Sequence, residues 1–237
     1  MKRKVIITAD GSKTIQIEDW NEQYHSIHGA IQEANHVFIK HGLWHICNVN
    51  LEVAKPDPKK KLLDEISILE IGFGTGLNAF ITTLEAKELR KSINYVGVEA
   101  FPVAVDEIAQ LNYAELISLD ASEVFTKLHD VPWEVQTEIT PNFTLTKRQQ
   151  FFSDIDDVSH YHLIYFDAFG ARVQPELWTE AIFKKMFDAL KPNGVLVTYS
   201  AKGSVRRAMQ AVGFTVERLE GPPGKREMLR ARKVRQH

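Results

Sequence analysis

The sequence predicts an α/β protein, with a Rossmann-like parallel sheet preceded by a small N-terminal lobe of a β-hairpin and a helix. Three observations predict this fold. A β-branched apolar run at 66–71 is followed by Gly72, Gly74 and Gly76 and then by a helical pattern at 77–84. Further apolar runs alternate with helical patterns, as expected for strands that are buried on both faces. An Asp-Gly turn between two β-rich runs predicts the hairpin. We expect the lobe at residues 1–60 and the sheet domain at 61–237.

The predicted elements follow one another along the chain in the order expected for such a sheet. They are a hairpin (3–8 and 13–18), a mostly helical segment (24–46), a solvated linker (55–61), a strand (66–71), a helix (77–84), a strand (94–99), a helix with Pro102 at its first position (103–112), a helix (114–130), a strand (143–152), a strand (161–166), a helix (176–190), a strand (195–200), a helix (203–213) and an antiparallel pair (214–219 and 227–231).

Composition excludes several classes of protein. A chain of 237 residues with 44% hydrophobic residues suits one globular α/β domain with a small additional lobe. No apolar run has the length of a membrane helix and the N-terminus lacks a signal-peptide core, so we expect a cytoplasmic protein without a membrane partner. The single cysteine, Cys47, cannot form an intrachain disulfide and is expected to be structural. His25 and His28 lack a Glu-x-x-His context, and we expect no metal site.

Charge is distributed unevenly along the chain. Residues 198–237 contain ten Lys and Arg residues and three acidic residues, whereas the rest of the chain contains 19 and 28. This asymmetry favours a face for a polyanion, although a solvated basic tail would give the same count. Arg206 and Arg207 on the helix at 203–213, and Lys225 and Arg226 in a proline-glycine turn, are the candidate phosphate contacts. A plain hairpin tip is the alternative for the turn.

The glycine-rich turn predicts a ligand that carries a nucleoside. Backbone can approach a ligand closely where no Cβ is present, and the N–H groups at the start of a helix attract anionic oxygens. A dinucleotide loop would have its third glycine at position 77, where this chain has Leu77. The pattern Glu70-x-Gly72-x-Gly74-x-Gly76 is instead typical of enzymes that use S-adenosylmethionine (SAM). A glycine-rich turn without a ligand is the alternative.

Acidic residues lie at or just after the ends of three of the predicted strands. Glu99 lies 25 residues beyond Gly74, where an acid accepts hydrogen bonds from both ribose hydroxyls. Asp154 is a candidate for the adenine amino group, and capping of a helix is equally plausible for it. Asp167 and Phe169 follow the clearest buried strand, so we expect them to face the ligand crevice. There the carboxylate can hold an amine and the aromatic ring can stack on a base.

Four segments together resemble a known family. They are LEIGFGTGLNAF (69–80), VEAFP (98–102), DAFG with PELW (167–178) and KGSVRRAMQAVGFTVERLEGPPGKREML (202–229). They resemble the methyltransferase domain of MnmC-type tRNA-modification enzymes, and YHSIHGAIQEANHVF (24–38) is similar to an early segment of the same family. The resemblance implies SAM-dependent methylation of the primary amine of 5-aminomethyl-(2-thio)uridine at the tRNA wobble position.

The resemblance also implies the site residues. Asp167 and Phe169 would be catalytic, tRNA phosphates would contact Arg206, Arg207, Lys225 and Arg226, and SAM would be held by Glu70, Gly72, Gly74, Gly76, Asn78, Glu99 and Asp154. We expect Asp167 to orient the amine more than to act as a strong base, because a carboxylate beside an ammonium raises the pKa of that ammonium. Gly170, where the family often has alanine, leaves the shape of the base pocket open.

In the bifunctional enzymes of this family an FAD oxidoreductase domain follows the methyltransferase domain. This chain ends at His237, so we expect it to use no FAD and to act on the free aminomethyl form, supplied by a separate oxidoreductase or by upstream wobble-uridine enzymes. Two alternatives remain from the sequence. One is an aminopropyltransferase of the spermidine-synthase type that uses decarboxylated SAM, and the other is a non-catalytic RNA-binding module.

Overall fold

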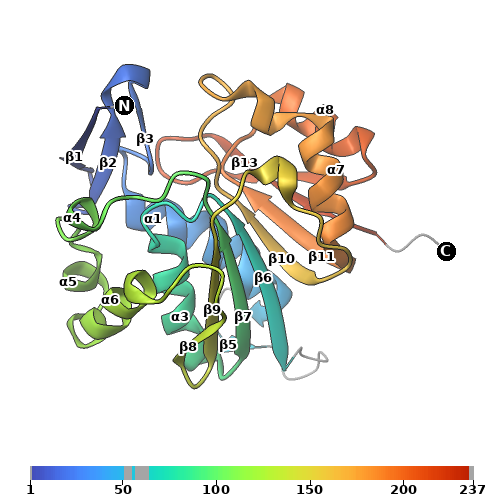
Figure 1. The fold of residues 1–237 in the computed structure, drawn as a ribbon. Coiled ribbons are helices and arrows are strands. Elements are labelled where there is room, and N and C mark those ends of the chain that lie inside the picture. The colour runs from blue at the N-terminus through green and yellow to red at the C-terminus, as the bar shows by residue number, and fades with distance from the viewer. Residues whose placement is uncertain (1, 51–54, 57–63, 235–237) are drawn as a thin grey trace.

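The computed structural model describes residues 2–50, 55–56 and 64–234, and its centre is an eight-stranded sheet (Figure 1). The strand order is β12-β13-β11-β10-β6-β7-β9-β8. Five neighbouring strands are parallel: β6 (Glu65–Ile71), β7 (Ser92–Val98), β9 (Phe143–Arg148), β10 (Tyr161–Phe166) and β11 (Leu190–Thr198). The antiparallel strands at the two edges are β8 (Thr137–Thr140), β12 (Thr215–Glu220) and β13 (Glu227–Arg232).

The sheet is covered on both faces, as its apolar strands predict. Successive side chains of a strand point to opposite faces, so Ile68 packs in one core and Leu69 in the other. The first core contains α3 (Leu77–Leu89) and α6 (Ser122–Asp130), and the second contains α7 (Glu180–Ala189) and α8 (Gly203–Ala211). Figure 1 shows α7 and α8 on one side of the sheet and α3 and α6 on the other.

The N-terminal lobe is a separate three-stranded sheet followed by a long helical segment. Its strands are β1 (Arg3–Ile7), β2 (Lys13–Ile17) and β3 (Glu22–Gln23), with the short helix η1 (Glu18–Trp20) between the last two. The predicted hairpin is therefore confirmed. The helical segment comprises α1 (Ala30–Ala34), a π-helix η2 (Asn35–Leu43) and α2 (Trp44–Ile46), and the two-stranded pair β4 (Val49–Asn50) and β5 (Lys55–Pro56) follows it.

The helical segment packs directly against the central sheet. Phe38 of η2 stacks at a tilt on Tyr165 of β10, with 5.1 Å between the ring centroids. A Cβ on Gly42 would lie 3.1 Å from Val197 and 3.2 Å from Tyr165, so glycine lets the helix approach the sheet closely. The contact of η2 with the sheet thereby positions α1, at the start of the same segment, near the carboxyl ends of the parallel strands.

Three predicted elements are wrong in their extent. Pro102 does not begin a helix, because α4 (Val105–Ile108) starts after Ala104, whose N–H donates to the Glu107 carboxylate at 3.1 Å. The helix predicted at 114–130 is divided into α5 (Tyr113–Ile117), η3 (Leu119–Ala121) and α6, because Ser118 adopts an extended conformation. The strand predicted at 143–152 ends at Arg148 and is followed by η4 (Phe152–Asp154).

The remaining boundaries differ by a few residues. Residues 24–29 are not helical, and the helix predicted from residue 176 begins at Glu180 after η5 (Pro175–Trp178). The strand β8 was not predicted. Most of the linker predicted at 55–61 lies outside the described residues.

Candidate active site

A cavity of about 1020 Å³ lies at the carboxyl ends of β6, β7 and β10, below the N-terminal lobe. The strand order reverses at β6, because β7 lies on one side of β6 and β10, which comes later in the chain, lies on the other. Open α/β sheets bind ligands at such a reversal point, beyond the carboxyl ends of the strands. Ion pairs join the lobe to the sheet domain around it. Arg3 pairs with Glu107 at 3.0 Å, and Arg172 pairs with Glu22 at 2.7 Å.

The glycine loop forms one wall of the cavity. Gly72, Gly74 and Gly76 all have positive φ, at 89°, 49° and 71°. A Cβ on Gly72 would lie 2.7 Å from the carbonyl oxygen of Asp167, and one on Gly74 would lie 3.0 Å from the Tyr24 ring. Gly72 and Gly74 line the cavity, whereas Gly76 caps α3 behind the loop against His129. The glycines are therefore required both by conformation and by close packing.

Glu99 lies where the sequence predicts it, directly after β7 and at the cavity wall. One carboxylate oxygen accepts the Gly74 N–H at 3.1 Å and the other accepts the Phe101 N–H at 3.0 Å. Burial raises the pKa of Glu99, and these two backbone hydrogen bonds oppose that shift. The backbone therefore fixes the carboxylate beside the glycine loop.

Glu70 and Asn78 lie behind the cavity wall and do not line the cavity. Glu70 is fully buried, and burial raises its pKa well above the ordinary value. The Asn78 amide donates to Glu70 Oε1 at 2.9 Å and to Asp167 Oδ2 at 2.8 Å. Asn78 thereby connects the end of β6 to the end of β10 and holds the Asp167 carboxyl from behind.

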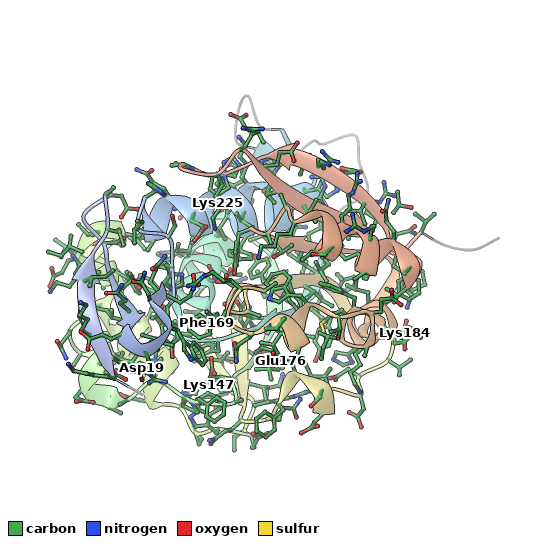
Figure 2. The ribbon with its side chains drawn as sticks, turned by 90° about the horizontal axis from the view of Figure 1, so that it is seen from above. Asp19, Lys147, Phe169, Glu176, Lys184 and Lys225 are labelled. Carbon is green, nitrogen blue, oxygen red and sulfur yellow. The ribbon has the colours of Figure 1, made fainter. Side chains whose placement is uncertain are left out.

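Asp167 and Phe169 both line the cavity after β10. Burial, together with the nearby charge of Glu33, raises the pKa of Asp167 to about 7, although Asn78 and Lys225 act in the opposite direction. Phe169 makes edge contacts with Tyr24 and Trp20, with ring centroids 4.9 Å and 5.7 Å away. Figure 2 shows Phe169 between the N-terminal sheet and the central sheet. A carboxyl group that titrates near neutral pH thus lies beside an aromatic wall.

Comparison with known proteins identifies the chemistry. Residues 113–234, just over half of the chain, match the model of a family described as S-adenosyl-L-methionine-dependent methyltransferase. The chain belongs to this family. The methyltransferase is also 28% identical over 231 residues to the bifunctional protein MnmC for tRNA 5-methylaminomethyl-2-thiouridine biosynthesis of Burkholderia mallei (strain SAVP1), a match that covers 89% of this chain and 32% of the relative. The chain spans about a third of the length of the curated relatives it matches.

Two solved structures have the same fold as this methyltransferase. MnmC2 from Aquifex aeolicus superposes with a TM-score of 0.70 at 23% identity, covering 97% of this chain and 70% of that one. Spermidine synthase from Thermotoga maritima superposes with a TM-score of 0.51 at 10% identity, covering 98% and 79%. At these identities both similarities show the fold alone, so the second gives the aminopropyltransferase alternative no support beyond shared architecture.

The cavity of the methyltransferase fits SAM. The backbone of Gly72 and Gly74 lines the cavity, and a side chain at Gly72 would collide with the Asp167 carbonyl oxygen. Glu99 presents a fixed carboxylate beside this loop, which is the group that two ribose hydroxyls need. Within the described residues no cluster of three or more His, Cys, Asp or Glu side chains could hold a metal ion.

Most of the other predicted site residues lie outside the cavity, and one of them, Lys225, forms an ion pair inside it. Asp154 is exposed and does not line the cavity, whereas its neighbour Ser153 does. Arg207 and Arg226 are exposed, and Arg206 is partly buried on α8. Lys225 points inward and pairs with Glu33. None of the helices in the described ranges has the length and hydrophobicity to cross a membrane.

Sequence reasoning missed several residues that form the cavity. They include Trp20, Tyr24 and Glu33 in the N-terminal lobe and Tyr199 after β11. Only the similarity of residues 24–38 to a family segment pointed to this part of the chain. Glu33 lies between Gln32 and Ala34 on a helix, where an acidic residue is usually solvated, and yet it is 5% exposed.

Proposed function

We propose that the chain transfers the methyl group of SAM to the primary amine of 5-aminomethyl-(2-thio)uridine at the tRNA wobble position. The observation that carries the proposal is the Asp167 carboxyl, which faces the cavity between the glycine loop and the aromatic wall. The part that the MnmC relatives play in tRNA 5-methylaminomethyl-2-thiouridine biosynthesis supports the choice of tRNA, as does the excess of basic residues from position 198 onward. A separate oxidoreductase or other upstream enzyme would supply the free aminomethyl form.

The amine must be neutral when it attacks, and an alkylamine is mostly protonated near neutral pH, like lysine with its ordinary pKa of about 10.4. SAM supplies an electrophilic methyl group when it is bound. A carboxylate of Asp167 can accept the proton that the ammonium loses, and its pKa near 7 makes it a better acceptor than an ordinary aspartate. Asn78 holds the same carboxyl in place, so we assign Asp167 both orientation of the amine and acceptance of its proton.

The remaining assignments follow from the cavity wall. Gly72, Gly74 and Glu99 would hold SAM, and Glu70 with Asn78 would support the loop from behind. Phe169 and Tyr24 would contact the uracil ring after it turns out of its stack. A cavity of about 1020 Å³ is at the upper end of the range of small-molecule sites, which suits a site that holds two reactants together.

The deciding experiment is mass spectrometry of wobble nucleosides. tRNA that carries 5-aminomethyluridine is incubated with the protein and SAM that is labelled in the methyl group, and the nucleosides are released. We expect the labelled methylaminomethyl nucleoside with wild type and little with Asp167→Asn. Incubation with decarboxylated SAM and putrescine tests the aminopropyltransferase alternative. Propylamine transfer, or tRNA binding without any methyl transfer, would overturn the proposal.

A further inference from the structure

One corner of the cavity contains a buried carboxylate that the mechanism above does not use. Glu33 of α1 is 5% exposed, and its Oε2 accepts the Ser26 N–H at 2.9 Å. Its Oε1 receives the ammonium of Lys225 at 2.5 Å. A buried carboxylate is costly unless it is paired, so this corner requires a positive charge.

Tyr199 forms the floor of the same corner. The Lys225 ammonium lies over its ring, 3.8 Å from the centroid, which is within the range of an attractive cation–π contact. The Tyr199 hydroxyl donates to the carbonyl oxygen of Ala168 at 2.8 Å, so the ring is anchored to the residue that follows Asp167. Carboxylate and ring together form a binding place for an ammonium group.

Asp167 belongs to the same electrostatic cluster. Its side chain lines the same cavity as Glu33, Tyr199 and Lys225, and the residue after it accepts the Tyr199 hydrogen bond. The charge of Glu33 accordingly raises the pKa of Asp167, and that of Lys225 lowers it. Asn78, which also contacts Asp167, is neutral. Two carboxyl groups therefore share one internal cation, that of Lys225.

The position of Lys225 on a turn indicates that it is the member of the cluster that can move. Glu33 is fixed on a helix and Tyr199 is fixed through its hydroxyl, whereas Lys225 extends on a flexible side chain from the turn between β12 and β13, with about a third of its side chain exposed. A lysine ammonium and the ammonium of an aminomethyl group have the same charge and three donors on one nitrogen. Lys225 therefore shows what the corner binds.

We propose that Glu33, Tyr199 and Asp167 form a subsite for the protonated primary amine of the substrate, and that Lys225 occupies this subsite until the substrate amine displaces it. The inference rests on the proposed function, since it assigns a place to the amine of that substrate. The amine arrives as an ammonium between Glu33 and Asp167, and Asp167 then takes its proton. Lys225 is accordingly a competitor for the subsite and not a contact to a tRNA phosphate.

Calorimetry with a nucleoside tests this assignment without methyl transfer. The protein is saturated with S-adenosylhomocysteine, and 5-aminomethyluridine is titrated into wild type, Lys225→Met and Glu33→Gln. Because Lys225 competes with the amine, we expect Lys225→Met to bind the nucleoside about tenfold more tightly than wild type. Glu33→Gln should bind it at least tenfold more weakly. Uridine, which has no amine, should bind all three proteins equally.

Two controls separate this role from others. Lys202→Met removes another lysine from the same cavity wall and should leave the affinity for the nucleoside unchanged. Lys225→Gln repeats the loss of charge in case the methionine variant is poorly folded, and an unchanged affinity for S-adenosylhomocysteine shows that each variant is intact. The inference is overturned if both Lys225 variants bind the nucleoside as tightly as wild type does, more weakly, or not detectably. The proposed function fails separately, if wild type does not methylate tRNA.

Discussion

At the scale of single residues, the Asn78 amide determines the geometry of the site. It donates to one oxygen of Glu70 and to one oxygen of Asp167, and it comes from the first turn of the helix that follows the glycine loop. The end of β6, where the glycine loop begins, and the Asp167 carboxyl that lines the cavity are thus connected by the same side chain. The sequence predicts that Asn78 contacts SAM; in the structure its side chain lies behind the cavity wall, and the contact with SAM stays a prediction.

Replacement of Asp167 by asparagine tests the catalytic assignment at this scale. Asp167→Asn keeps the size of the side chain but cannot accept a proton, so we expect kcat to fall by about 10²- to 10⁴-fold. The affinity for SAM, measured by calorimetry, should change little. Asp156→Asn, an exposed neighbour of the cavity segment, is the control and should keep wild-type activity. Equal rates for Asp167→Asn and wild type would remove Asp167 from the mechanism.

The raised pKa of Asp167 also predicts a pH dependence of the rate. The carboxyl accepts a proton only when it is ionised, and its pKa is about 7. The single-turnover methylation rate should therefore increase as pH increases through about 7 and should level off above it. A profile without this inflection between pH 6 and 8 would contradict the role of Asp167 as proton acceptor.

The same pKa predicts a change in stability. The pKa in the folded protein lies above the ordinary value of 3.8, so the folded state binds the proton more tightly than the unfolded state does. The contribution of Asp167 to stability is therefore present below about pH 4 and is lost as pH rises toward 7. Asp167→Asn should have a Tm several degrees above that of wild type at pH 8 and an equal Tm at pH 4, measured by calorimetry.

At the scale of elements, the glycine loop allows a controlled comparison between two glycines. Gly72 and Gly11 have similar φ values of 89° and 83°, but a Cβ on Gly72 meets the Asp167 carbonyl at 2.7 Å whereas one on Gly11 meets no atom within 4 Å. Gly11→Ala should cost only the strain of a left-handed alanine, about 1–2 kcal/mol of unfolding free energy. Gly72→Ala should cost more and should abolish SAM binding by calorimetry. Equal losses for the two variants would show that the contact with Asp167 is unimportant.

The sheet was predictable because its strands are local apolar runs. Ile66–Ile71 and Tyr161–Phe166 are buried on both faces, and their residues alone indicate strands. The helices at 103–130 were less predictable, because their ends depend on single contacts such as that of Glu107 with the Ala104 N–H and on the extended backbone of Ser118. Glu33 and Tyr199 could not be found from local pattern, since they are 166 positions apart and meet only through the fold.

At the scale of the whole molecule, the tip of the C-terminal hairpin closes the cavity against the N-terminal lobe. Gly224 packs so tightly that a Cβ would lie 2.2 Å from the His28 ring, and His36 bonds to the Glu220 carbonyl at 2.8 Å. Segments from the two ends of the chain therefore share one contact, and Lys225 reaches Glu33 through it. The cavity depends on this docking as much as on the sheet.

Substitution of Gly224 tests the docking. Gly224→Ala should push the turn at 221–226 away from the lobe, and hydrogen exchange of amides in the turn and in α1 should become at least tenfold faster. His28→Ala removes the ring that obstructs the new methyl group, so the double variant should recover part of the protection. Additive effects of the two substitutions would show that the turn and the ring do not depend on each other.

The exposed residues Arg207 and Arg226 lead to a prediction about the binding of the whole tRNA. If Arg207 and Arg226 contact phosphates, replacement of each by glutamine should weaken tRNA binding and should reduce the slope of log Kd against log salt by about one per lost contact. Lys184 is the matched control, because it is exposed on α7 and lies far from Phe169 (Figure 2). Lys184→Gln should leave the affinity and its salt slope unchanged, as filter binding at several salt concentrations can show.

The strand order also determines when the central sheet and the cavity can be completed during folding. β13 lies between β11 and β12, so β12 has no place in the sheet until the later β13 has been inserted beside β11. During synthesis the glycine loop can fold early, whereas the turn that carries Lys225 docks only after β13 has emerged from the ribosome. The cavity of a nascent chain is accordingly completed last, when the hairpin of β12 and β13 has joined the sheet and its turn meets the N-terminal lobe.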